Sequence, residues 1–566
     1  MVKISHIHID NFRSIQSLDM DLNQVCALVG PNNAGKTNLL MAMNRVLGRD
    51  WVTVQAFNES DVYGRDPSRD ISIVVTFDEP IPYYKFKASQ PAEISSLSFL
   101  YTRYKRGEQV GERRLEQTCL NPKGGVVQVP DQAPKSGVKT QYKPLSGIPG
   151  EVRDAVPLIH IGTNRSLHDQ LPSNRYSLLR PLIEDIDRDF RDPNNSVLVQ
   201  NRAGEESEVP RVERFEALMR AGMTLLRTDS FRDLESTIKE RALRLLGLDP
   251  ASDALDFFFA PFDTMTFYKN LELHVREAGF DIDASELGGG MQNALVLAIL
   301  QAYEQRRKQG AIILIEEPEM FLHPQVQRSV YKTLQNIGKS NQVIYTTHSP
   351  HFVTLPDYRD VQLVRRRATG TEAQKSELPM SDIRRDKLVK ELDPERNELF
   401  FASRLLLVEG DTEKLALPEY AKNMAVDLDE AGATIVEVGG KRNLMEIAGI
   451  AISFGIPTGV VYDEDSSDFR NQRADEESLN GQLDALARDD RSVRVWRLVK
   501  NYEDHLRGCL GEEEYQRLCN KFASMGKPTR ARRIAQEPDL PIPPPFGEIL
   551  DWLVGQPVEG SSATDQ

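Results

Sequence analysis

The segment GPNNAGKT, residues 30–37, is the feature that most restricts how this chain can fold. An apolar run, VCALVG, leads into it, and TNLLMAMNRVL follows with apolar residues at helical spacing. Strand, glycine loop and helix therefore come in the order that a phosphate-binding loop requires. Gly30 and Gly35 allow backbone N–H groups to turn toward a phosphate, while Lys36 and Thr37 would contact phosphate oxygens and Mg²⁺. The sequence thus predicts an α/β domain that binds a nucleotide.

A second apolar strand is predicted where AIILIEEPE, residues 311–319, ends in carboxylates. Glu316 is placed to hold Mg²⁺, and Glu317 to orient or deprotonate an attacking water. A charged strand end is also typical of a plain buried strand, so the neighbouring segments decide between the two. VIYTTHSP forms a further buried run that ends near His348, and SELGGGMQ opens an amphipathic helix. Together these segments indicate ATP hydrolysis.

This order of elements resembles the ABC-type ATPase head of the SMC and recombination ATPases, in which NFRS, here residues 11–14, also recurs. The resemblance implies that residues 285–292 form a signature motif for the γ-phosphate of a nucleotide held by another subunit. It also implies that FLHP, residues 321–324, is the dimer-facing D-loop and that His348 is the switch histidine. The family's usual signature is LSGGQ, which leaves open which amides of SELGGGMQ touch phosphate. The nucleotide-binding residues predicted in this way are Arg13, Gly30, Asn32, Asn33, Gly35, Lys36, Thr37, Asn38, Ser285, Gly288 and Gly290.

The interval between the phosphate loop and the second strand is longer than a compact head needs. Residues 166–250 carry apolar residues at spacings of three and four, which predicts a helical insertion for dimer contact. A helical layer on the ATPase sheet is the alternative. We assign residues 1–165 and 251–367 to the two parts of the ATPase domain. The polar stretch ATGTEAQKSELPMSD lacks periodicity and predicts a linker over residues 368–402.

Strands and helices alternate again after this linker. RLLLVEGDTE, ATIVEVGGK and PTGVVYDED each give an apolar strand that ends in acidic residues or glycines. Alternation predicts a mainly parallel sheet, and carboxylates at the strand ends then meet at one edge of it. Such a set of oxygen ligands suits Mg²⁺ or Mn²⁺ and phosphodiester chemistry.

The EG, GGK and DED segments closely resemble the Toprim domain, here residues 403–566. That resemblance implies acid/base work or metal ligation by Glu409 and metal binding by Asp463 and Asp465. Glu413, four residues past Glu409, is expected on the same helix face as a further ligand. An ABC-type head followed by a Toprim domain resembles the OLD family, named for overcoming lysogenization defect. Members of that family are ATPase-coupled nucleases, several of them in anti-phage defence.

The OLD resemblance extends to two further positions. NYEDHL places Glu503 and Asp504 where the family carries an additional metal carboxylate, and GKPTRARRIA places Lys527 where it carries a lysine that stabilises the pentavalent phosphate. A charged helix face accounts for Glu503 equally well, and Lys527 also suits contact with backbone phosphate. The predicted catalytic residues are Glu409, Glu317, Lys527 and His348. The predicted metal ligands are Thr37, Glu316, Glu409, Glu413, Asp463, Asp465 and Glu503.

Composition limits which cellular compartment and which partners are expected. No apolar run approaches the roughly 18 residues of a membrane span, the first residues do not read as a signal peptide, and the four cysteines form no CxxC pair. We therefore expect a cytoplasmic protein without a membrane partner. The net charge of −15 argues against nonspecific coating of nucleic acid. Basic patches at residues 365–367, 384–387 and 527–533 keep a nucleic-acid substrate open.

From these patterns we expect an ATP-regulated, Mg²⁺- or Mn²⁺-dependent DNA endonuclease that forms a homodimer or homotetramer and works with a partner protein of a defence operon. Two alternatives stay open: an ATP-switched scaffold or sensor with an inactive Toprim fold, and a ribonuclease acting on RNA or tRNA. A topoisomerase or primase would need a companion domain with a catalytic tyrosine, which we do not find. The sequence does not give the sign of nucleotide control.

Overall fold

The computed structural model describes residues 1–48, 52–87, 89–133, 140–163, 179–200, 206–246, 249, 255, 263–277, 280–306, 310–379, 394–464, 470–489, 492–538 and 540–555. The chain divides into two compact units. One contains Met1–Thr163 and Gln309–Gln566, and the other contains Asn164–Lys308. Both the phosphate loop and the predicted Toprim domain belong to the first unit, and the predicted α/β fold class is confirmed.

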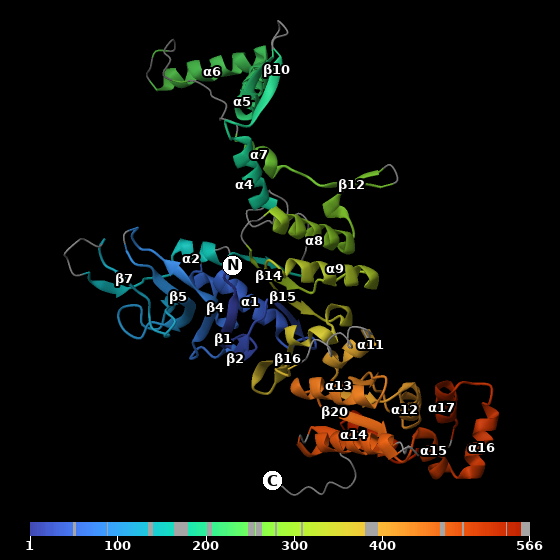
Figure 1. Ribbon diagram of the computed structural model, residues 1–566. Coiled ribbons are helices and arrows are strands. Elements are labelled where there is room, and N and C mark those ends of the chain that lie inside the picture. The colour runs from blue at the N-terminus through green and yellow to red at the C-terminus, as the bar shows by residue number, and fades with distance from the viewer. Residues whose placement is uncertain are drawn as a thin grey trace. The chain divides into compact units, whose positions relative to one another are not determined.

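The centre of the first unit is a six-stranded sheet in the order β17-β16-β3-β15-β14-β9, parallel except for β17. Figure 1 labels three of its strands, β14, β15 and β16. β3, β14 and β15 are buried along their whole length, which is why they read as unbroken apolar runs. The strands are β3 (Val25–Val29), β9 (Leu158–Ile161), β14 (Ile312–Glu316), β15 (Gln342–Thr347), β16 (Val361–Arg367) and β17 (Gly370–Gln374).

A five-stranded antiparallel sheet, in the order β2-β1-β4-β5-β6, lies beside it. Helix α1 (Lys36–Leu47) contacts strands of both sheets and shares one hydrophobic core with them. Because α1 is held on two sides, the loop at its start has a fixed position. The antiparallel strands are β1 (Ile4–Phe12), β2 (Ile15–Asp21), β4 (Ile71–Tyr83), β5 (Ala92–Arg103) and β6 (Arg113–Leu120). Shorter elements here are η1 (Val54–Ala56), η2 (Glu59–Asp61), η3 (Tyr63–Arg65), β7 (Gln128–Pro130), β8 (Tyr142–Pro144) and α2 (Gly150–Ala155).

The described residues of the second unit are largely helical, but they also form two β-hairpins. One of them, β10–β11, lies within residues 166–250, for which only helices were predicted, and the other, β12–β13, lies in the interval assigned to the ATPase domain. Part of the interval assigned to the ATPase domain, up to residue 308, clusters with this unit. Its elements are α4 (Leu179–Phe190), β10 (Ser196–Gln200), β11 (Glu206–Pro210), α5 (Arg211–Leu226), α6 (Asp229–Leu245), α7 (Thr264–Lys269), β12 (His274–Glu277), β13 (Phe280–Asp283), η4 (Ala284–Glu286) and α8 (Gly289–Arg306).

The C-terminal part of the first unit is built on a parallel sheet in the order β19-β18-β20-β21, as the alternation predicts. α12 packs on α17 and α18 through a second core. The strands are β18 (Arg404–Val408), β19 (Ala433–Glu437), β20 (Thr458–Asp463) and β21 (Val493–Leu498). The helices are α12 (Asp411–Asn423), α13 (Lys441–Ser453), α14 (Arg470–Asp489), α15 (Tyr502–Leu510), α16 (Glu512–Lys521), α17 (Lys527–Ala535) and α18 (Phe546–Leu553).

The described residues of the interval predicted as a linker, residues 368–402, include regular secondary structure. They form β17, α11 (Pro394–Asn397) and η7 (Glu398–Phe401). β17 lies at an edge of its sheet and is polar, so it carries little of the apolar pattern that marks a central strand. The remaining elements of this unit are α9 (Pro324–Ile337), η5 (Pro350–Phe352) and η6 (Leu355–Asp360). None of the helices in the described part of the chain has the length and apolar character needed to cross a membrane.

Candidate active sites

The phosphate loop is shaped by glycines that no other residue could replace. Gly30 and Gly35 have φ values of 153° and 105°. A Cβ at Gly30 would lie 2.0 Å from the carbonyl oxygen of Val364, and one at Gly35 would lie 2.2 Å from Oγ1 of Thr371. The loop is therefore packed tightly against the β16–β17 hairpin. Its exposed outer side carries Asn32, Asn33 and Thr37.

Lys36 is buried at the start of α1, with 5% of its surface exposed. Its ammonium donates hydrogen bonds to the carbonyl oxygens of Gly30 (2.7 Å) and Pro31 (2.9 Å). Burial lowers the pKa of Lys36 to about 8, although the carboxylates of Glu317 and Glu319 oppose this shift. A partly desolvated cation beside inward-turned backbone amides favours an anionic ligand such as a nucleotide phosphate.

The NFRS turn between β1 and β2 is locked onto this loop by a chain of hydrogen bonds. Thr371 Oγ1 donates to the carbonyl oxygen of Ala34 at 2.9 Å, so it accepts from Ser14 Oγ at 2.7 Å. Asn38 Nδ2 in turn donates to Ser14 Oγ at 2.7 Å. Arg13, the neighbouring residue, has Nη1 2.8 Å from Sδ of Met41 on α1. The structure thus links Asn38 to the phosphate loop through Ser14 and Thr371, and it places Arg13 beside α1, the helix that follows the loop.

Glu316 ends β14 and is almost fully buried. Its Oε1 lies 3.1 Å from Nε2 of His160, whose Nδ1 lies 3.4 Å from Nδ2 of Asn44 on α1. Sequence reasoning missed His160. The pattern that could have indicated His160 is the short apolar run LIHI, in which the histidine is the one residue that is not buried. Because β9 pairs with β14 in parallel, His160 reaches the acidic end of the neighbouring strand.

Glu317 and His348, both predicted as catalytic, lie together. His348 Nε2 is 3.3 Å from Glu317 Oε1, and about 30% of each side chain is exposed, 29% and 31% respectively. Glu317 has φ 43°, and its backbone N–H donates to the carbonyl oxygen of Thr346 at 3.1 Å. Burial and the Lys36 ammonium lower the pKa of His348, against the opposing charge of Glu317. The imidazole is therefore neutral near neutral pH.

Glu319 supports this pair and was missed by the sequence analysis. Its Oε1 accepts hydrogen bonds from Thr347 Oγ1 (2.7 Å) and from the backbone N–H of His348 (2.6 Å). Burial raises the pKa of Glu319. The third acid of EEPE is thus a structural partner of the segment that carries His348.

The predicted signature residues lie in the second unit, at the turn that precedes α8. The backbone N–H and Oγ of Ser285 both donate to Asp283 Oδ1 at 2.7 Å. Gln292 Nε2 donates to the carbonyl oxygen of Ser285 at 2.8 Å, which fixes the turn from the helix side. Gly288 and Gly290 lie on either side of the first residue of α8.

In the C-terminal part, Glu409 and Asp463 meet at the carboxyl edge of the sheet. Glu409 follows β18 and Asp463 ends β20, and the backbone N–H of Asp463 donates to Glu409 Oε2 at 3.4 Å. The expectation that Glu409 and Glu413 share a helix face is wrong, because α12 begins at Asp411 and Glu409 precedes it. The two carboxylates come together because the chain turns at Gly410 into the helix.

Glu413 is a buried carboxyl group in the first turn of α12, with 4% of its surface exposed. Burial raises the pKa of Glu413 to about 7, and the charges of Glu409 and Glu503 add to this rise. Three carboxyl groups thus crowd one small region. Such crowding is relieved when a divalent cation binds, so the donor set fits Mg²⁺ or Mn²⁺.

Lys527 faces this carboxylate group from the start of α17. Its Nζ lies 2.9 Å from Glu503 Oε2. Burial is the largest single influence on Lys527 and opposes its protonation, while the hydrogen bond to Glu503 favours it. The charges of Asp463 and Glu413 act in the same direction, and the net effect raises the pKa of Lys527. The structure therefore brings five of the predicted residues together, while Asp465 lies outside the described residues.

Two family descriptions match the chain. The AAA ATPase domain matches residues 2–119 and 227–353. The overcoming lysogenization defect protein-like TOPRIM domain matches residues 400–465. The first match contains the phosphate loop, Glu316 and Glu317, and the second contains Glu409, Glu413 and Asp463.

Curated relatives match over most of their length. The OLD nuclease of Thermus scotoductus is 30% identical over 490 residues, covering 85% of this chain and 85% of the relative. The Old nuclease of Escherichia phage P2 is 25% identical, covering 82% of this chain and 77% of the relative. The endonuclease GajA of Bacillus cereus is 24% identical, covering 78% and 71% respectively.

Proposed function

The chain belongs to the OLD nuclease family, and from that premise we propose that it is an ATP-regulated, divalent-metal-dependent DNA endonuclease of anti-phage defence. The family makes it an ATPase and an endonuclease. One observation carries the finer proposal. Carboxyl groups from the turn after β18 and from α12, β20 and α15 gather at one edge of a parallel sheet, and an ammonium from α17 faces them. This is the donor set of a metal-assisted phosphodiester hydrolase.

Each residue of this site has a distinct task. Bound Mg²⁺ or Mn²⁺ would supply a water of lowered pKa and charge for the leaving oxygen. Glu409, Glu413, Asp463 and Glu503 would hold the cations, and Glu409 would also accept a proton. Lys527 keeps its proton because its pKa is raised, so it serves as a cation and not as a base. Its charge is suited to the negative charge that develops on the phosphoryl oxygens.

At the nucleotide site, Lys36 and Thr37 would contact phosphate and metal, and Glu316 would complete the metal's ligands. Glu317 would orient or deprotonate the attacking water, with its position fixed by His348. A neutral His348 accepts or donates a hydrogen bond without adding charge. Ser285, Gly288 and Gly290 would complete the site of a second subunit, which makes the active assembly at least a homodimer.

The second unit offers a surface for this assembly. Helices α5 and α6 leave large apolar side chains in water, the most exposed being Leu225 (81%) and Leu245 (89%). Monomeric soluble proteins rarely leave such a set uncovered. We assign the exposed apolar side chains of α5 and α6 to contact with a second copy of the chain. Dimer contact is also the role predicted from the sequence for the insertion at residues 166–250.

Contacts of the β16–β17 hairpin support control of cleavage by the nucleotide. At one end, Thr371 donates to the carbonyl oxygen of Ala34 in the phosphate loop. At the other, Gln374 Nε2 donates to the carbonyl oxygen of Ser453 at 3.0 Å, at the C-terminus of α13. The N-terminal cap of α13, Gly440, donates its N–H to the carbonyl oxygen of Glu409 at 3.0 Å. A single hairpin and a single helix thus connect the two sites.

Nicking of supercoiled plasmid tests the proposal. Native protein should nick with Mg²⁺ or Mn²⁺ and lose activity with EDTA. Glu409→Ala and Asp463→Asn should each reduce nicking by about 10²-fold or more. Glu514→Gln is the matched control, because Glu514 pairs with Arg517 on α16 and is not among the predicted metal ligands. Lys36→Ala, with and without ATP, gives the sign of nucleotide control.

Two outcomes would contradict the proposal. Nicking by the Glu409→Ala and Asp463→Asn variants at the native rate would remove these residues from catalysis. Intact plasmid under every metal and nucleotide condition would exclude the DNA substrate. The same set of variants tested on single-stranded RNA and tRNA then separates a ribonuclease from an ATP-switched scaffold, which cleaves neither.

A further inference from the structure

Asp61 is a buried residue that accepts hydrogen bonds from both the side chain and the backbone of Arg13. Its Oδ1 accepts a hydrogen bond from Nε of Arg13 at 2.8 Å, and its carbonyl oxygen accepts one from the backbone N–H of Arg13 at 2.6 Å. Only 1% of Asp61 is exposed. It ends the short turn η2, and its Oδ2 accepts the backbone N–H of Asn58 at 3.2 Å. Arg45 is the other cation nearby, at 3.8 Å.

Arg13 is held in an uncommon backbone conformation, with φ 53°. Its side chain is 29% exposed and runs beside α1, where Met41 lies one turn beyond Thr37. Nε is held by Asp61 and Nη1 by Met41, and Nη2 has no partner among the described residues. The guanidinium therefore lies near the phosphate end of α1 with one nitrogen left for another contact.

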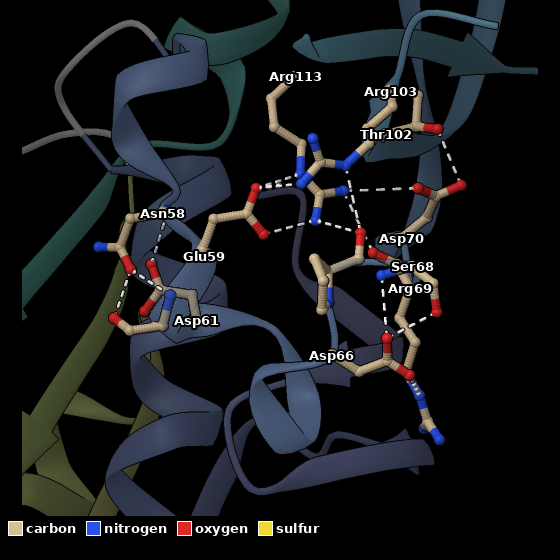
Figure 2. A network of polar contacts seen from close by, with 12 residues as sticks. Asn58, Glu59, Asp61, Asp66, Ser68, Arg69, Asp70, Thr102, Arg103 and Arg113 are labelled. Atoms are coloured by element: carbon tan, nitrogen blue, oxygen red, sulfur yellow. Dashed lines mark hydrogen bonds and ion pairs between the residues drawn. The ribbon is translucent and has the colours of Figure 1, made fainter. Parts of the chain in front are cut away.

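The turn that carries Asp61 is fixed from the opposite side by Glu59 (Figure 2). Oε1 of Glu59 accepts from Nη2 of Arg103 at 2.6 Å and from Nε of Arg113 at 2.8 Å. Oε2 accepts a second bond from Arg113, from Nη2 at 2.8 Å. Arg103 and Arg113 belong to the paired strands β5 and β6. The turn therefore cannot move without breaking charged hydrogen bonds to the antiparallel sheet.

We propose that Asp61 is a positioning residue of the nucleotide site, which holds the Arg13 guanidinium toward the nucleotide phosphates while Glu59 keeps the Asp61 turn in place. The geometry shows how. The carboxylate of Asp61 accepts from Nε of Arg13, and the backbone carbonyl oxygen of Asp61 accepts from the Arg13 N–H, so Asp61 fixes both the backbone position and the side-chain direction of Arg13. An arginine placed before the ligand arrives loses less side-chain entropy on binding. This inference rests on the nucleotide site of the proposed function.

Calorimetric titration of the full-length protein with Mg²⁺–ADP and with a non-hydrolysable ATP analogue tests this role. Asp61→Asn and Arg13→Ala should each weaken nucleotide binding by about tenfold. Combined, they should weaken it no more than Arg13→Ala alone, because Asp61 acts through Arg13. Asp66→Asn is the control. Asp66 belongs to the same polar network, but it bonds Ser68 and Arg69 (Figure 2).

Native nucleotide affinity in Asp61→Asn would overturn the inference, as would an equal further loss when Asp61→Asn is added to Arg13→Ala. If burial of Asp61 makes Asp61→Asn unstable, Glu59→Gln replaces it, since half of the Glu59 side chain is exposed. Glu59→Gln should weaken binding by about threefold in the native background and not at all with Arg13→Ala. Lys36→Ala tests the nucleotide site separately. Native nucleotide affinity in this variant would reject the nucleotide site itself.

Discussion

The Nζ atom of Lys527 lies 2.9 Å from Oε2 of Glu503, although the two residues come from different helices, α17 and α15. This pair depends on how α17 is docked. Arg532 Nε, one turn further along α17, lies 2.9 Å from Glu419 Oε1 on α12. The same α12 carries Glu413 in its first turn. Helix α12 therefore carries the carboxyl group of Glu413 and, through Glu419, also holds the helix that carries the Lys527 ammonium.

Lys527→Met should reduce plasmid nicking by about 10²-fold and leave ATP hydrolysis unchanged, because the ammonium is aimed at the nuclease site alone. Single-turnover nicking and a phosphate-release assay measure the two activities. Lys521→Met is the matched control, since Lys521 is an exposed lysine paired with Glu537. Equal nicking by both variants would show that Lys527 contributes no more than a surface charge.

Glu317→Gln should slow ATP hydrolysis by about 10²-fold while nucleotide binding remains within twofold of native, because the change removes a proton acceptor and keeps its size. His348→Gln should have a smaller effect on hydrolysis, since His348 acts by holding Glu317 at 3.3 Å. Steady-state turnover and calorimetric binding give these values. Retained turnover in Glu317→Gln would remove Glu317 from its proposed role.

Gln374→Ala should uncouple the two sites. We expect ATP hydrolysis at the native rate, with the effect of ATP on nicking reduced to less than about twofold, because the bond to the Ser453 carbonyl is lost. Glu372→Gln serves as the control on the same strand, since Glu372 pairs with Arg367 instead. If Gln374→Ala responds to ATP as the native protein does, nucleotide control runs through another contact.

Leu225→Lys combined with Leu245→Lys should shift the protein from an oligomer to a monomer, because charges would replace the exposed apolar side chains. Sedimentation velocity across a concentration series measures the change, and ATP hydrolysis should fall with it. Val110→Lys is the control at another exposed apolar position, with 59% exposure. An unchanged sedimentation coefficient would place the subunit contact elsewhere.

A histidine–aspartate group on β1 and β2 should make folding depend on pH. Burial opposes protonation of His8, but hydrogen bonds to Asp19 and Asp10 outweigh it and raise the pKa of His8 above 6.5. The hydrogen bond from His8 lowers the pKa of Asp19 below 3.8. The His8 contribution is thus complete below pH 6.5 and lost as pH rises through the raised pKa. The Asp19 contribution is complete above pH 3.8 and lost as pH falls.

The native protein should therefore unfold at a higher temperature than His8→Gln at pH 5.5, by roughly 1–2 °C, and the difference should shrink at pH 8. Thermal unfolding in matched buffers measures this difference. Lys3→Gln is a suitable control, because Lys3 lies just before β1 and bonds Gln24 instead of the histidines. If the difference in unfolding temperature between the two proteins grows as pH rises, protonated His8 does not stabilise the fold.

Features that depend on residues close together along the chain could be predicted before the fold was known. The phosphate loop follows from Gly30, Gly35 and Lys36 between a strand and a helix, because those residue types have few other uses in that order. The meeting of Glu409 and Asp463 also followed, since the carboxyl ends of parallel strands share one edge of a sheet. In both places the local pattern and the fold class were sufficient.

Contacts between segments far apart along the chain could not be predicted in the same way. His160 reaches Glu316 through the pairing of β9 with β14, and Asp61 reaches Arg13 through a turn fixed by two further strands. The residue pattern of the polar strand β17 did not reveal that it belongs to the ATPase sheet. Strand order and helix docking depend on how the whole core packs, and many weak contacts share in that choice. No single motif carries that information, so it emerges only when the complete chain folds.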